Sequence, residues 1–148
     1  MDPLWILGVD PGKMTGFARF DAGEWRGSEQ LPMDPFLDYA EAYMHWLHHN
    51  GISAVIACEN FIINVNTAKK SHGDRQWSLE QIGVLRRDAR KYGHTFELTP
   101  PSDAKRFSSD DKLKAAGWWN PGHGHGNDAT RQVITALGRR SVVIGLES

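Results

Sequence analysis

The sequence has one cysteine, Cys58, among its 148 residues, and it has no long hydrophobic run. A single cysteine excludes both a disulfide framework within the chain and a zinc site built from several thiolates. The amino-terminal apolar run stops at Asp10, and no basic segment precedes it. We therefore expect neither a signal peptide nor a membrane span, and we expect the reducing cytoplasm as the compartment.

The chain also lacks a strong net charge, since its formal charge at pH 7 is -1. This total hides an asymmetry between the two parts of the chain. Residues 1–60 hold three basic and nine acidic side chains, whereas residues 61–148 hold fourteen basic and nine acidic ones, a local balance of +5. Such a split predicts a positive surface beside an acidic pocket, although solvated helix faces explain any single cluster equally well.

The hydrophobic pattern predicts one mixed α/β domain over residues 1–140, followed by a C-terminal tail, 141–148. Apolar or alternating runs indicate strands at 4–9, 15–20, 24–31, 53–59 and 94–99. Amphipathic spacing indicates helices at 35–49, 77–92 and 127–137, with short helical pieces within 102–107 and 109–116. Because three strands precede the first helix, the order differs from a βαβ repeat.

Three carboxylates stand at the ends of predicted elements: Asp10, Glu59 and Asp128. The first two end buried strands, where a charge is costly without a partner, and no nearby Lys or Arg serves both. A hard cation with oxygen ligands, above all Mg²⁺, would satisfy them. His125 precedes Asp128 by three residues, so both side chains can share one face of a helix start. Two metals held there would align the attacking water and the leaving oxygen of a phosphodiester.

Each acid also has a purely structural explanation. Asp10 could brace the Pro11–Gly12 turn, Glu59 could be an ordinary strand-end acid, and Asp128 could stabilise a helix N-terminus. Taken alone, each explanation is as good as metal binding. The occurrence of all three acids in one chain favours the metal site.

Several segments, in order along the chain, carry a pattern typical of one family. The run ILGVDPGKMTGFARF (6–20) resembles the opening hairpin of the RuvC-type Holliday-junction resolvases, in which the first strand ends in a catalytic aspartate. IACENFI (56–62) is similar to the family strand that carries a glutamate, and HGND (125–128) matches its final His-x-x-Asp. The segments around Lys105 and Lys112 resemble those that place two lysines near the scissile phosphate.

This resemblance implies an RNase H-like fold, with a five-stranded mixed sheet flanked by helices. It implies a homodimeric endonuclease that uses Mg²⁺, or Mn²⁺ in its place, and resolves four-way junctions by paired symmetrical nicks during DNA recombination or repair. Asp10, Glu59, His125 and Asp128 would be the catalytic and metal-binding residues. The short chain and the HGND form resemble phage members of the family, which points to a bacterial or phage-infected cell.

Basic residues near these acids are predicted to contact DNA phosphates, which set affinity rather than sequence choice. An aromatic residue two positions after Glu59 is the candidate for entering the junction, although the family often has its aromatic one position later, where this chain has isoleucine. Ordinary surface roles explain several of the basic residues equally well. The predicted DNA contacts are Lys69, Lys70, Arg75, Lys105, Lys112 and Phe61.

Two further features have more than one interpretation. Trp118 and Trp119 could stack on bases, or they could belong to a packed aromatic loop. The helix at 77–92, with Leu79, Ile82 and Leu85 facing inward, is the candidate dimer interface by resemblance to the family. These inward residues would have to serve both the core and the partner.

Other functions stay open at this point. The glycines after Asp10 resemble the phosphate-binding hairpin of actin-like and sugar-kinase ATPases, but those proteins need two such domains. A broader branch or flap nuclease, a nuclease for RNA–DNA hybrids, and a junction-binding protein without strong catalysis are the remaining alternatives.

Overall fold

The structure, a computed structural model, describes the backbone of residues 2–60 and 72–140, with side chains in the second stretch from residue 76 onward. Ten elements follow one another in this part of the chain. They are β1 (Ile6–Asp10), β2 (Met14–Asp21), β3 (Glu24–Pro32), α1 (Met33–His49), β4 (Val55–Glu59), α2 (His72–Lys91), β5 (Thr95–Thr99), α3 (Pro101–Phe107), α4 (Asp110–Ala116) and α5 (Gly124–Arg139).

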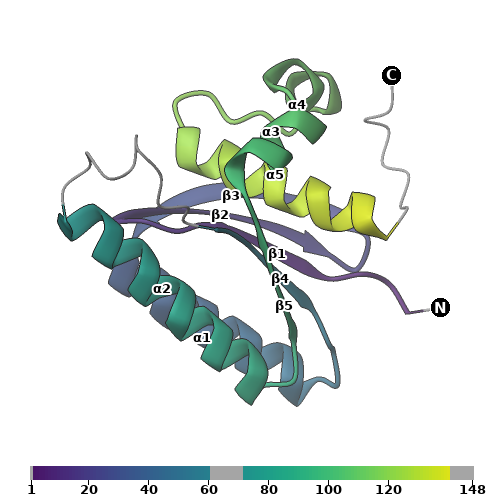
Figure 1. Cartoon of the computed structure of the whole chain (residues 1–148). Coiled ribbons are helices and arrows are strands. Elements are labelled where there is room, and N and C mark those ends of the chain that lie inside the picture. The colour runs from purple at the N-terminus through teal and green to yellow at the C-terminus, as the bar shows by residue number, and fades with distance from the viewer. Residues whose placement is uncertain (1, 61–71, 141–148) are drawn as a thin grey trace.

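The five strands form one mixed sheet in the order β3-β2-β1-β4-β5 (Figure 1). Strands β1, β2 and β3 pair antiparallel, while β1–β4 and β4–β5 pair parallel. The central strand β1 is buried along its whole length, as its continuous apolar sequence predicts for a strand covered on both faces. The predicted five-stranded mixed sheet is confirmed.

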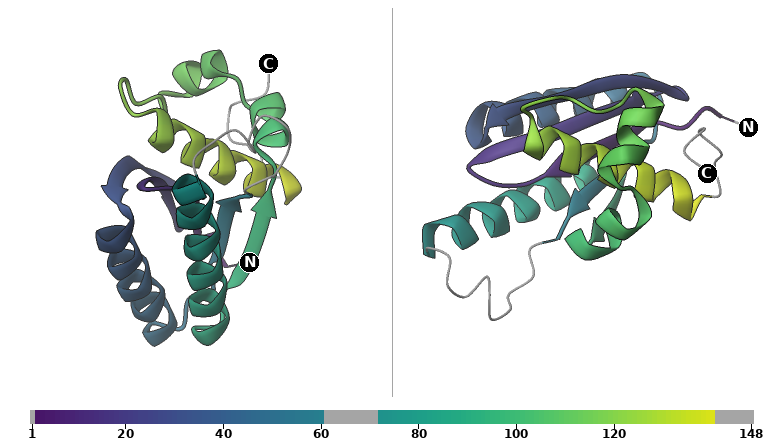
Figure 2. Two further views of the ribbon diagram at one scale, coloured as in Figure 1. Left: turned by 60° about the vertical axis from the view of Figure 1, so that its left-hand side comes forward. Right: turned by 90° about the horizontal axis from the view of Figure 1, so that it is seen from above.

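Helices cover both faces of the sheet (Figures 1 and 2). Helices α1 and α2 lie on one face, and α5 lies on the other with α3 and α4 beside it. Alternate side chains of β1 supply the two cores, because successive residues of a strand point to opposite faces. Leu7 and Val9 pack in the core beneath α1 and α2, whereas Ile6 packs in the core beneath α5.

Two glycines allow α5 to lie unusually close to the sheet. A Cβ added at Gly8 would fall 2.7 Å from Val133 Cγ2. A Cβ added at Gly16 would collide with the carbonyl group of His125 and would lie 2.6 Å from the Gly126 amide nitrogen. The absence of a side chain at these two positions therefore sets the height of α5 above β1 and β2.

Two helices begin three or more residues earlier than the sequence pattern indicates, α2 at His72 instead of Trp77 and α5 at Gly124 instead of Asn127. Glycine-rich sequence at residues 124–126 gives no helical periodicity, so its conformation depends on contacts with the sheet. Helix α5 also continues through Gly138, which we expected to end it. The Phe107 ring occupies the Cβ position of Gly138, with Cζ only 2.5 Å away, so this glycine accommodates the packing of α3 and does not mark the end of α5.

Leu79 does not face inward as predicted, since 50% of its surface is exposed. The inward positions at this end of α2 are instead taken by the buried polar residues Ser78 and Gln81. Ile82 and Leu85 are buried, as predicted. Within residues 2–60 and 72–140, no helix is long and apolar enough to cross a membrane.

Candidate active site

The carboxyl ends of β1 and β4 bring Asp10 and Glu59 together. These neighbouring strands are parallel, and Val9 pairs with Cys58, so the residue that follows each lies at the same edge of the sheet. Asp10 is 6% exposed. The two acids therefore lie where the strand direction changes within the sheet, since β2 is antiparallel to β1 and β4 is parallel to it. Sites in α/β sheets are common at such a switch point.

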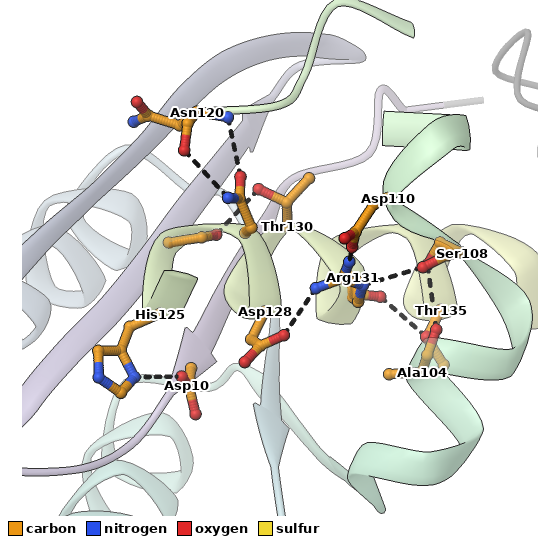
Figure 3. A network of polar contacts seen from close by, with 12 residues as sticks. Asp10, Ala104, Ser108, Asp110, Asn120, His125, Asp128, Thr130, Arg131 and Thr135 are labelled. Carbon is orange, nitrogen blue, oxygen red and sulfur yellow. Dashed lines mark hydrogen bonds and ion pairs between the residues drawn. The ribbon is translucent and has the colours of Figure 1, made fainter. Parts of the chain in front are cut away.

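The N-terminal part of α5 brings His125, in the first turn, and Asp128, just after it, to the same edge (Figure 3). His125 Nδ1 lies 2.8 Å from Asp10 Oδ2. The backbone amide of His125 donates to Gln30 Oε1 at 3.1 Å, which ties this turn to β3. The structure thus gathers the four residues Asp10, Glu59, His125 and Asp128 from three elements far apart in sequence.

Gln81 fixes the turn that follows Asp10, a role that sequence reasoning missed. The Gly12 amide donates to Gln81 Oε1 at 2.7 Å, and Gln81 Nε2 donates to Thr15 Oγ1 at 2.6 Å. Gln81 is completely buried, and its bond to Thr15 is protected from water. The only signal in the sequence was a glutamine one position before the inward-facing Ile82.

Arg131 holds Asp128 and was also missed (Figure 3). One guanidinium nitrogen lies 2.7 Å from Asp128 Oδ1, a second contacts Asp110, and Nε donates to the Ser108 carbonyl at 2.9 Å. The Arg131 side chain is 7% exposed. A buried guanidinium with this many partners docks α3 and α4 onto α5 and orients the Asp128 carboxylate. Its three-residue spacing from Asp128 was the available signal.

Burial and mutual repulsion raise the pKa values of two acids of the group. Burial, a hydrogen bond with Asp10 and the charges of Asp10 and Asp128 raise the pKa of Glu59 to about 9, with Lys105 acting in the opposite direction. Burial and the charge of Asp10 raise the pKa of Asp128, against the lowering effect of Arg131. With all its acids ionised, the site would therefore hold more negative charge than its own cations neutralise.

The donor set suits a hard divalent cation. Carboxylate oxygens with one imidazole are ligands that Mg²⁺ and Mn²⁺ accept, and the surplus negative charge is what such an ion would neutralise. Among the residues with described side chains, no three His, Cys, Asp or Glu groups already form a metal cluster. Asp10 instead contacts His125, and Asp128 contacts Arg131.

The hydrogen bond to Asp10 raises the pKa of His125, and burial opposes it with a smaller effect. The charged imidazole is thus stabilised by its carboxylate partner. His123, its neighbour two residues earlier, precedes α5 as the N-cap residue. Only His125 contacts one of the predicted acids.

The predicted DNA-contacting residues fall into two groups. Lys105 on α3 borders the same cavity as Asp128, and Lys112 on α4 is partly buried. The others cannot be placed: Phe61, Lys69 and Lys70 lie outside the described residues, and only the backbone of Arg75 is described, as part of α2.

The raised pKa of Glu59 predicts an unusual pH dependence of stability. With a folded pKa of about 9 against an ordinary 4.5, the folded protein keeps a proton that the unfolded chain releases. The free energy of unfolding should therefore fall as pH rises through this window. Glu59→Gln should flatten this slope and stabilise the metal-free protein at pH 8 by about 1 kcal/mol.

Thermal unfolding in a chelator, at several pH values, measures this effect. Glu29→Gln, on strand β3, is the matched control and should leave the slope as it is. An equally steep slope in Glu59→Gln would contradict the shifted pKa.

Two comparisons by sequence found no relative: no family model matches the chain, and no curated protein matches it. Structures similar to this chain include two of Thermus thermophilus RuvC. One, in complex with a Holliday junction substrate, has a TM-score of 0.62 at 14% identity, covering 93% of this chain and 96% of that one. The other has a TM-score of 0.61 at 13% identity, covering 94% and 98%. The chain therefore has the RNase H-like fold of these RuvC structures, over nearly its whole length.

Proposed function

We propose that the protein is a metal-dependent endonuclease that resolves four-way DNA junctions. One observation carries this proposal: Asp10, Glu59, His125 and Asp128 meet at one sheet edge of a fold shared with RuvC. A Thermus thermophilus protein of that fold is bound to a Holliday junction substrate, which supports branched DNA as the substrate class here.

Each residue of the group has a distinct role in this proposal. Asp10, Glu59 and Asp128 would hold Mg²⁺, or Mn²⁺ in its place. Such ions polarise the phosphodiester and lower the pKa of the attacking water. His125 orients Asp10 through Nδ1. When the imidazole is neutral and its proton is on Nδ1, Nε2 is free to accept a proton from that water.

The charge around the acids controls how the substrate approaches. Unneutralised carboxylates repel a phosphodiester, so binding of the ion and of the DNA backbone should be coupled. Lys105 is close enough to lower the pKa of both Glu59 and Asp128. We therefore propose that Lys105 attracts the scissile phosphate, with Lys112 on the neighbouring helix in support.

A cleavage assay tests this function directly. The purified protein is incubated with Mg²⁺ and a labelled synthetic four-way junction, with a linear duplex of the same sequence as control. We expect paired nicks at symmetrical positions that DNA ligase can reseal, because hydrolysis in this family leaves a 5′-phosphate and a 3′-hydroxyl. Equal cleavage of flaps or RNA–DNA hybrids would favour a broader nuclease, and binding without nicking would contradict the enzyme proposal.

Two symmetrical nicks need two active sites, and we propose a homodimer that supplies them. Leu79 and Val84 on α2 are 50% and 39% exposed. Gly83 lies between them in the sequence, and a Cβ added there would have no other atom within 4 Å. Both side chains are exposed and apolar, and the glycine between them would let a second helix approach closely, so α2 is our candidate for the contact with the second copy.

Sedimentation should show a dimer at micromolar concentration, and Leu79→Glu with Val84→Glu should give monomers that nick only one strand per encounter. Trp46→Glu, which changes an exposed aromatic on α1 (49% exposed), is the control and should leave the dimer intact. A wild-type monomer, with or without junction DNA, would contradict the proposal.

A further inference from the structure

A cavity of about 470 Å³ opens beside Asp128, where α3, α4 and the segment 117–123 meet the start of α5. Its lining includes Lys105, Ser109, Trp119, Asn127, Asp128 and Arg131. The volume lies within the range of pockets that hold small organic ligands. Because Asp128 borders the cavity, a group bound there would be adjacent to the proposed site of cleavage.

The two neighbouring tryptophans have different environments, which separates the two interpretations of this aromatic pair. Trp118 stacks on Trp25 with ring centroids 4.5 Å apart, and it packs against the core beneath α5. Trp119 instead lines the cavity. Trp118 is thus a packing residue, while Trp119 presents an aromatic surface to whatever enters.

The segment that carries Trp119 is held in place by hydrogen bonds of the next residue, Asn120 (Figure 3). The backbone amide of Asn120 donates to Asn127 Oδ1 at 2.8 Å, and Asn127 Nδ2 donates back to the backbone carbonyl of Asn120 at 3.0 Å. Asn120 Nδ2 also donates to the Ser28 carbonyl at 3.1 Å. Asn127 is 2% exposed. The loop is therefore fixed to α5 and β3, so the cavity exists before a ligand arrives.

The groups around Trp119 suit a nucleotide. Lys114 Nζ lies 4.9 Å from the centre of the Trp119 ring and occupies one face, so a ligand must use the other. Lys105 supplies a positive charge, whereas the charge of Arg131 is already balanced by Asp110 and Asp128. An aromatic ring, a cation and hydrogen-bonding groups such as Ser109 are what a base with its phosphate requires.

We propose that this cavity receives the base of a nucleotide next to the scissile phosphate, turned out of the helical stack and stacked on Trp119. Lys105 then contacts the phosphate of that nucleotide. This inference rests on the proposed junction cleavage, since branch points offer bases that unstack at low cost. Its consequence is that binding and cleavage depend on the presence and identity of the base at this position.

The test uses junctions of one architecture in which each nucleotide flanking the mapped nick carries A, C, G, T or an abasic site. Affinity is measured in Ca²⁺ and the nicking rate in Mg²⁺. For wild type, the abasic site should weaken binding about tenfold at one of these positions. Trp119→Ala should abolish this difference, and Trp119→Phe should keep most of it. Trp46→Ala, on α1, is the control and should behave as wild type.

The outcomes separate this inference from the function it rests on. If wild type nicks the junction but treats all bases and the abasic site alike, the base pocket is wrong and the nuclease proposal stands. A difference that persists in Trp119→Ala would also overturn the pocket. If wild type neither binds nor nicks any junction, the proposed function fails, and the pocket inference fails with it.

Discussion

Replacing Asp10 by asparagine should lower the rate of junction cleavage by several orders of magnitude while leaving junction binding intact or tighter. The amide keeps the size of the side chain but removes the charge that would hold a hard cation. It also removes part of the negative charge that repels phosphate, which explains why binding should survive. Glu59→Gln and Asp128→Asn should behave in the same way.

Single-turnover nicking in Mg²⁺ and gel-shift affinity in Ca²⁺ measure the two effects separately. Asp103→Asn, an exposed aspartate in the first turn of α3, is the matched control and should nick at the wild-type rate. Near-normal nicking by Asp10→Asn would contradict the assignment of these acids to the active site. Loss of binding in all three variants would instead indicate that the acids are structural.

Gly16→Ala should reduce cleavage by about a hundredfold, although Gly16 has no functional group. The new methyl group would overlap the His125 carbonyl, so the first turn of α5 must move away from β2. That movement separates His125 and Asp128 from Asp10, and a misplacement of about 1 Å at a catalytic group can cost this much activity. Overpacking should also destabilise the fold by about 1–3 kcal/mol.

Gly8→Ala separates the loss of activity from the loss of stability. A Cβ there would collide with the Ala129 carbonyl oxygen and lie 2.7 Å from Val133 Cγ2, so it would press on α5 on the C-terminal side of His125 and Asp128. We expect similar melting temperatures for the two variants but a larger loss of nicking in Gly16→Ala. Equal losses of nicking at equal stability would mean that the position of the first turn has no special importance.

The amino-acid sequence alone was sufficient to predict the sheet and the places of two acids at the ends of its strands. A strand covered on both faces has to be apolar throughout, so β1 and β4 are visible as apolar runs. Asp10 and Glu59 are visible for the same reason, because each is the first charge after such a run. The spacing between His125 and Asp128 is likewise a local property.

Other features depend on contacts between segments far apart in the chain. The start of α5 at Gly124 depends on Gln30 and on the missing side chain at Gly16. Gln81 is buried where it accepts a hydrogen bond from the Gly12 turn, and the rotation of α2 that places it there leaves Leu79 at the surface. Periodicity cannot show such contacts, because it records only which residues are apolar and how they are spaced.

The environment of each charged group was likewise decided by the tertiary structure. The sequence contains Asp128, Arg131 and Asp110, but only the docking of α4 on α5 pairs all three. The same docking opens the cavity beside Asp128 and directs Trp119 into it while Trp118 packs on Trp25. The sequence by itself determined which chemical groups are present and where the strands end. The tertiary structure decided which groups face one another, because burial and pairing are properties of the assembled core.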